Sequence, residues 1–131
     1  MQRDAIAPLL IGTVVLAAIA AGLAITGGPG SARAEKRDMA RLADLRTLAA
    51  FVRCVAQTTG QVPETLTPVE ECGTDLPLTD RASQTPYRYE ALSETSFRLC
   101  AAFERPELIT EYDMAGASWQ PERGCFALSE P

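Results

Sequence analysis

The stretch EKRDMARLADLRTLAAFVRCVAQT, residues 35–58, decides the fold of this chain. Its apolar residues recur at spacings of three and four, which is typical of an amphipathic α-helix with one apolar stripe. The stripe comprises Met39, Leu42, Leu45, Leu48, Val52 and Val55. The charged residues expected mostly off this stripe are Arg37, Arg41, Asp44 and Arg46. Gly60 and Pro63 follow, and such a pair ends a helix and prevents its resumption.

Downstream of this helix, short segments alternate apolar and polar residues, as half-buried strands do. The first contains Tyr87 and Tyr89, the second is FRLCAAF at 97–103, and LSET at 92–95 suits a hairpin turn between them. A third strand is predicted at 124–128 (GCFAL). The intervening segments, 61–85 and 105–123, are polar and are predicted to be loops. The expected fold class is α+β, with the long helix packed on a small three-stranded antiparallel meander.

Upstream, residues 5–26 (AIAPLLIGTVVLAAIAAGLAIT) contain no charge. A helix of this length spans about 33 Å, enough to cross a hydrocarbon core of about 30 Å. The sequence therefore predicts a transmembrane anchor at 1–26, a Gly/Pro linker at 27–34 and a globular head at 35–131.

A cleaved signal peptide is the alternative interpretation of this segment. Arg3 precedes the apolar run, and SARA at 31–34 offers small residues at a cleavage position, so that a soluble mature chain would start at Glu35. The apolar run exceeds the roughly 7–15 residues of a signal peptide's apolar region, which favours an uncleaved anchor.

Small residues recur four apart in the predicted anchor, at Ala18 and Gly22 and at Ala20 and Ala24. This spacing allows helix backbones to approach closely in lipid. The four residues are candidates for packing against another integral membrane subunit. The alternative is that short apolar residues simply fill the span.

The head contains four cysteines, Cys54, Cys72, Cys100 and Cys125, with no C-x-x-C pair and no histidine in the chain. A metal site is therefore not expected. An even count in a small head behind a membrane segment indicates two disulfides and an oxidising compartment. Three connectivities are possible, and proximity along the chain favours Cys54–Cys72 and Cys100–Cys125. Four reduced thiols are the alternative.

Two signals disagree about the side of the membrane on which the head lies. Positive charge is denser after the span than before it, which by the positive-inside rule places the head in the cytoplasm. Disulfides require the opposite side. We give the cysteines more weight, because the short N-terminal tail offers the charge rule few residues to count.

The head is acidic, with six Arg against thirteen Asp and Glu over residues 50–131. It would repel phosphate backbones, so nucleic acid is not an expected partner. Without histidine, a G-x-S-x-G elbow or a Gly-rich phosphate loop, the sequence predicts no enzyme, no cofactor and no small-molecule substrate. Trp119 and Tyr112, in the long loop, are candidate anchors for a protein partner. The alternative for both is packing on the head's own core.

Four segments in this order, RDMARLADLRTL at 37–48, GQVP at 60–63, PYRY at 86–89 and FRLCA at 97–101, carry a family resemblance. Over about residues 35–128 the chain resembles the heads of bacterial type IV pilin-like proteins, especially type II secretion pseudopilins and single-pass membrane proteins with such a head. The resemblance implies a bacterial inner-membrane protein with its head in the periplasm.

Family members carry a prepilin-peptidase site and one helix unbroken from membrane to head. This sequence shows no such site, and GGPG at 27–30 interrupts the helix. The expectation is thus an accessory or stabilising subunit of a larger bacterial membrane complex. A divergent minor pseudopilin is the alternative. Pseudopilins also bind calcium near their strands, and the acidic residues that could serve, although at no matching motif position, are Asp75, Asp80, Glu111 and Asp113.

Overall fold

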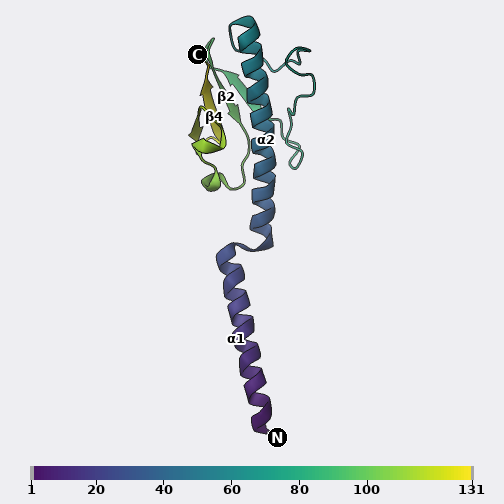
Figure 1. The fold of residues 1–131 in the computed structure, drawn as a ribbon, viewed down its shortest axis with the longest axis vertical. Helices are drawn as coiled ribbons and strands as arrows, with labels where there is room; N and C mark the ends of the chain where they lie inside the picture. The colour runs from purple at the N-terminus through teal and green to yellow at the C-terminus, as the bar shows by residue number, and fades with distance from the viewer. Residues whose placement is uncertain (1, 131) are drawn as a thin grey trace. The chain divides into compact units, whose positions relative to one another are not determined.

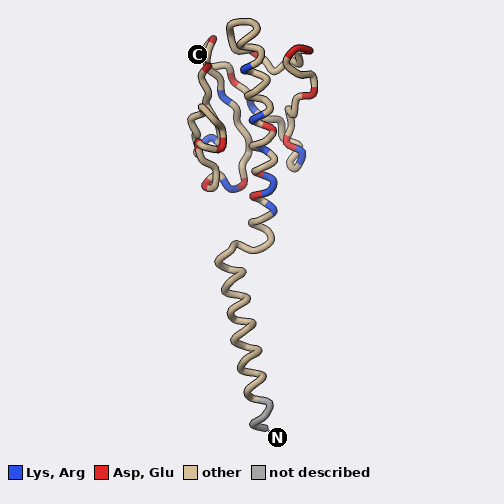
Figure 2. The backbone as a smooth tube through the Cα atoms, viewed as in Figure 1, with Lys and Arg blue, Asp and Glu red and all other residues tan. Residues whose placement is uncertain are grey.

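The computed structural model describes residues 2–130, which form two compact units that divide between residues 34 and 35. The first unit contains the helix α1, Gln2–Thr26. In Figure 2 the tan part of the tube along α1 shows neither the blue of Lys and Arg nor the red of Asp and Glu. Its large side chains are exposed, for example Leu9 at 67% and Leu16 at 68%. The helix is long and apolar enough to cross a membrane, as an anchor or a signal segment does.

The two threonine hydroxyls of α1 are satisfied within the helix. The Thr13 hydroxyl donates to the Leu10 carbonyl at 2.8 Å, and the Thr26 hydroxyl donates to the Gly22 carbonyl at 3.0 Å. Back-bonding of this kind removes a hydroxyl donor from the helix surface. The helix therefore presents an apolar surface in spite of its threonines.

Gly27 alone separates α1 from the second helix, α2, Gly28–Thr59. Gly27 and Gly28 have positive φ angles of 79° and 64°, a conformation that glycine adopts without steric cost. Residues 28–34 of the predicted linker lie in α2, and the two units divide at the predicted start of the head, between residues 34 and 35. Pro29 fits there, since a proline in the first turn lacks only an N–H that would be unpaired in any case.

The head contains four antiparallel strands: β1 (Arg88–Ala91), β2 (Ser96–Cys100), β3 (Ala117–Gln120) and β4 (Cys125–Ser129). Their order is β1-β2-β4-β3, so that β4 lies between β2 and β3. The three predicted strands pair in the predicted order, as β1, β2 and β4, but the predicted strand count is wrong, because β3 forms inside the segment predicted as a polar loop and adds to the edge beside β4. Two 3-10 turns, η1 (Pro106–Leu108) and η2 (Glu111–Asp113), precede β3. The α+β class is confirmed.

The sheet packs its apolar face against α2. Phe97 pairs with Leu128 and Leu99 with Phe126 across β2 and β4, and all four are buried. They form one core with apolar residues of α2, namely Leu42, Leu45, Leu48, Val52 and Val55. Figure 1 shows the sheet beside α2, in the pilin-like arrangement expected.

Two residues of α2 depart from the predicted pattern. Met39, assigned to the buried stripe, is 51% exposed. Arg41, assigned to the solvent face, is only 3% exposed. The burial of Arg41 has an electrostatic cause, because Arg41 lies among carboxylates that loops of the head bring to the helix.

Both disulfides have the predicted pairing. Cys54–Cys72 joins α2 to the loop that follows it, with Cα atoms 5.6 Å apart. Cys100–Cys125 joins register partners on β2 and β4, with Cα atoms 4.0 Å apart. The first bond thus attaches the long loop to the helix, and the second cross-links the two central strands of the sheet.

Candidate functional site

The most buried polar group of the head is an ion network centred on Arg41. Asp38 and Arg41 lie three residues apart on one face of α2, and Nη1 of Arg41 donates to Oδ1 of Asp38 at 2.6 Å. Nε of Arg41 donates to Oδ2 of Asp80 at 2.8 Å. Nη1 also donates to Oε1 of Glu104 at 3.0 Å. One guanidinium therefore ties two distant loops to the helix.

The carboxylates of this network are satisfied by further donors. Asp38 accepts hydrogen bonds from the backbone N–H groups of Glu104 and Arg105, the latter at 2.7 Å. Asp80 accepts from the Ala82 N–H at 2.9 Å and from the Ser83 hydroxyl at 2.6 Å. Buried charges are tolerated when they are paired and hydrogen-bonded in this way.

The electrostatics of the network favour fixed charge. Burial raises the pKa of Asp80, but hydrogen bonds from Ser83, Ala82 and Arg41 outweigh it and lower that pKa to about 2. Hydrogen bonds from Arg37 and Arg41 lower the pKa of Glu104 to about 2, against a smaller opposing effect of burial. A general acid or base works best with a pKa near the operating pH. These two carboxylates are therefore suited to holding loops rather than to transferring protons.

Hydrogen bonds from two tyrosine hydroxyls also hold β1 in place: Tyr87 lies immediately before the strand and Tyr89 lies within it. The Tyr87 hydroxyl donates to Oδ2 of Asp44 at 2.8 Å, and the Tyr89 hydroxyl donates to the Pro63 carbonyl at 2.5 Å. Burial raises the pKa of Tyr89 to about 12. Burial and then the hydrogen bond to Asp44 raise the pKa of Tyr87. Both hydroxyls remain protonated donors at neutral pH.

The predicted interaction residues lie in different settings. Ala18, Ala20, Gly22 and Ala24 are exposed on α1. Tyr112, in η2, is 89% exposed. Trp119, on β3, is partly buried, with its ring centroid 4.6 Å from that of Phe126 and 5.5 Å from that of Phe103. Trp119 thus packs on the head's own core, whereas Tyr112 presents its ring to solvent.

The acidic residues considered for calcium are not brought together. Asp80 belongs to the Arg41 network, and Asp113 accepts from the Thr110 N–H at 2.7 Å. Within residues 2–130, no group of three acidic, cysteine or histidine side chains has a geometry that could hold a metal ion. These carboxylates serve as loop caps and ion-pair partners where the structure shows their contacts.

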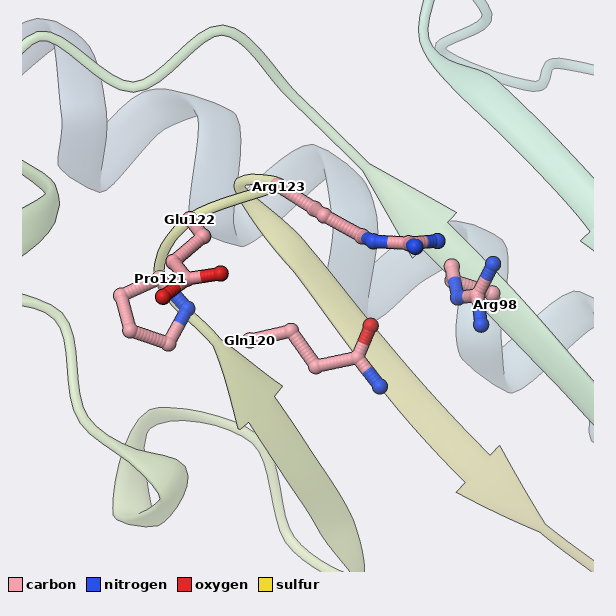
Figure 3. Close-up of a pocket in the computed structure, with 5 residues that line it drawn as sticks. All are labelled: Arg98, Gln120, Pro121, Glu122 and Arg123. Carbon is pink, nitrogen blue, oxygen red and sulfur yellow. The ribbon is translucent and has the colours of Figure 1, made fainter.

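A polar pocket on the sheet was not foreseen from the sequence. It has a volume of about 420 Å³ and is lined by Arg98 of β2, Gln120 of β3, and Pro121, Glu122 and Arg123 of the β3–β4 turn. In Figure 3 the side chains of Arg98, Gln120 and Arg123 extend toward one another, while Glu122 lies farther off. Since Phe97 and Leu99 face the core, strand alternation directs Arg98 to the opposite face of the sheet. Arg98 is distant in the chain from the other four lining residues, which are consecutive. The strand order brings them to one pocket, because β2 and β3 both lie beside β4.

No protein-family model, curated protein or solved structure matches this chain. The likeness to pilin-like heads therefore rests on the quoted sequence segments and on the arrangement of one long helix and a small antiparallel sheet.

Proposed function

We propose that this chain is a non-enzymatic, single-pass bacterial membrane protein whose periplasmic, pilin-like head is an accessory or stabilising subunit of a larger membrane complex. One observation carries the proposal: α1 exposes large apolar side chains along its length, whereas the head has a closed core of its own. Such a helix needs lipid or other helices around it.

The energetics of α1 support an anchor. Its exposed large apolar residues are Ile6, Leu9, Leu10, Ile11, Val14, Val15, Leu16, Ile19, Leu23 and Ile25. Burial of each such side chain away from water is favourable by roughly 1.5–3 kcal/mol. The burial free energy of ten such side chains far exceeds the cost of ordering one helix in a bilayer. The same helix in water would therefore be strongly disfavoured.

The disulfides support a periplasmic head. Two bonds join elements that the chain separates by 18 and 25 residues. Such bonds persist in oxidising compartments and are rare in the cytosol. The positive charges after the span are partly engaged within the head, since Arg37 and Arg41 both pair with Glu104.

An interaction role is supported by what the polar residues of the head do. The Arg41 network and the tyrosine hydroxyls hold loops in place, with carboxylates kept ionised and phenols kept protonated. Tyr112 projects into solvent, as an anchor residue for a partner would. On α1, the small-residue pairs offer close approach to another membrane helix.

A divergent minor pseudopilin is the second candidate, and the helix-on-sheet head favours it. The break at Gly27 speaks against it, because a fibre subunit of that family carries one unbroken helix from membrane to head. This candidate requires processing by prepilin peptidase. A chain of unchanged mass in strains with and without the peptidase would eliminate it.

Two double variants of α1 test the proposed function. Ala18 and Gly22 are about 200° around the helix from Ala20 and Ala24 when each pair is taken as a unit, so the pairs lie on opposite faces. Replacement of one pair by leucine blocks close packing on its face alone, and the other pair is the matched control. We expect one variant, A18L/G22L or A20L/A24L, to lose its complex on native gels after digitonin extraction of membranes.

The opposite result is also defined. If the unchanged chain migrates only as a monomer after digitonin extraction, the subunit proposal fails. If both double variants retain the complex, α1 is not the packing surface and the association must come from the head.

A further inference from the structure

The turn between β3 and β4 holds Arg123 at a fixed place beside β2. The Arg123 N–H donates to the Gln120 carbonyl at 3.1 Å, and the Gly124 N–H donates to the Pro121 carbonyl at 3.3 Å. Gly124 has a φ of +64°, and a Cβ there would lie 2.5 Å from the Ala101 carbonyl oxygen. The turn therefore requires glycine at this position and packs its backbone tightly against the chain leaving β2.

Arginine donors in this pocket lack acceptors. Nη1 of Arg98 donates to Oε2 of Glu90 at 2.8 Å, but Nε of Arg98 is buried without a hydrogen-bond partner. The Arg123 guanidinium has no hydrogen bond or ion pair with any residue in the described range 2–130. A buried donor without an acceptor costs about 1–3 kcal/mol, and more when charged.

This lack of partners is unusual in so acidic a head. Most other arginines of the head pair with a carboxylate, as Arg37, Arg41, Arg46, Arg53 and Arg105 do. Residues 50–131 hold thirteen acids for six arginines, so acceptors are abundant. Two guanidinium groups that extend toward one another repel each other, and an anion between them reverses the sign of that interaction.

We propose that the pocket lined by Arg98, Gln120 and Arg123 binds a carboxylate group. The planar fork of Arg123 matches a carboxylate with two parallel hydrogen bonds, and the Gln120 amide can add a third donor. Pro121 supplies an apolar wall. Glu122 adds a negative charge to the lining, which favours a singly charged carboxylate over a phosphate dianion.

The carboxylate has two possible sources, an acidic side chain or C-terminus of a partner protein and a free organic acid. We assign it to the partner protein, and this assignment alone rests on the proposed function. The pocket would then be the point at which the head recognises an acidic segment of the complex.

The first experiment tests the pocket on the full chain in uncharged detergent micelles. Side-chain Nε–Hε resonances of ¹⁵N-labelled arginine are followed during titration with acetate, with an N-acetylated, C-amidated Gly-Glu-Gly peptide, and with inorganic phosphate at constant ionic strength. We expect saturable shifts at Arg98 and Arg123 with acetate and peptide, weaker shifts with phosphate, and none at exposed Arg81.

Matched variants make the result specific. R123Q removes one exposed guanidinium and should weaken binding of the peptide at least tenfold, whereas R81Q should leave it unchanged. Equal, unsaturable shifts at all arginines, or tight binding retained in R123Q, would overturn the proposal. Tighter binding of phosphate than of carboxylate would overturn the assignment of the ligand.

A second experiment identifies the source of the carboxylate. Phenylglyoxal modifies accessible arginines, and peptide mass spectrometry reports the modified fraction at each site. Protection of Arg123 in native membranes but not in the purified chain supports a partner protein. Equal modification in both states, together with acetate binding to the purified chain, would refute the partner assignment and point to a free acid. Migration of the unchanged chain only as a monomer on native gels would refute the proposed function and leave the carboxylate pocket standing.

Discussion

Replacement of Arg41 by glutamine should be the most damaging single change in α2. The guanidinium is 3% exposed and bonds to Asp38 and Asp80, which are themselves 2% and 6% exposed. Loss of one partner from a buried ion pair costs about 3–5 kcal/mol, because the remaining charge is left uncompensated. The free energy of unfolding of a small domain is roughly 5–15 kcal/mol in total, so R41Q should lose a large share of its stability.

Urea unfolding of the disulfide-intact full chain in uncharged micelles measures this loss. Trp119 is the single tryptophan and packs on Phe126, so its fluorescence reports the core of the head. R81Q, at an exposed position, is the control and should lie within about 0.5 kcal/mol of the unchanged chain.

The dependence on pH separates an electrostatic loss from a packing loss. In the folded chain the pKa of Asp80 is lowered from 3.8 to about 2, so its contribution is complete above pH 4 and is lost as pH falls toward 2. That contribution is about 2 kcal/mol. In R41Q the part of this lowering that Arg41 supplies is lost, so the variant loses less stability than the unchanged chain as pH falls from 4 to 2, and its deficit should shrink over that range. A deficit below about 1 kcal/mol at pH 7, or one that does not shrink between pH 4 and pH 2, would contradict an electrostatic role for Arg41.

Three further changes have expected outcomes. G124A should lose about 1–3 kcal/mol in urea unfolding because of its left-handed backbone, and more because of the clash with the Ala101 carbonyl, whereas G30A in α2 should be neutral or stabilising. Reduction of both disulfides should remove roughly 3 kcal/mol for each loop, measured by urea unfolding with and without reductant, and an unchanged midpoint would contradict a role in stability. The unchanged chain should stay with membranes on carbonate extraction, and L16R should raise the extracted fraction, since a central arginine costs about 2.5–3.5 kcal/mol; complete extraction of the unchanged chain would contradict an anchor role.

The sequence predicted the elements that depend on local pattern. The Leu42, Leu45 and Leu48 spacing defined α2, and the alternation around Phe97 and Leu99 defined β2, because burial of an apolar face is the dominant favourable term in folding. The cysteine pairs followed from proximity along the chain.

What the sequence missed depends on contacts between distant residues. Arg41 is buried because Asp80 and Glu104 reach it from two loops, which no periodicity can indicate. β3 escaped notice because its residues, ASWQ, alternate between apolar and polar over four positions only and lie in a polar segment. The arginine pocket depends on the strand order of the sheet, and no local pattern indicates that Arg98 and Arg123 line the same pocket.

Intact mass spectrometry of the native protein, taken from membranes without reductant, tests whether the chain is an anchored, disulfide-bonded subunit of a larger complex. We expect a full-length chain four hydrogens lighter than the reduced form, released from a stoichiometric complex with a second membrane protein. A mass that begins at Glu35, or a full-length chain with four free thiols and no bound partner, would contradict it.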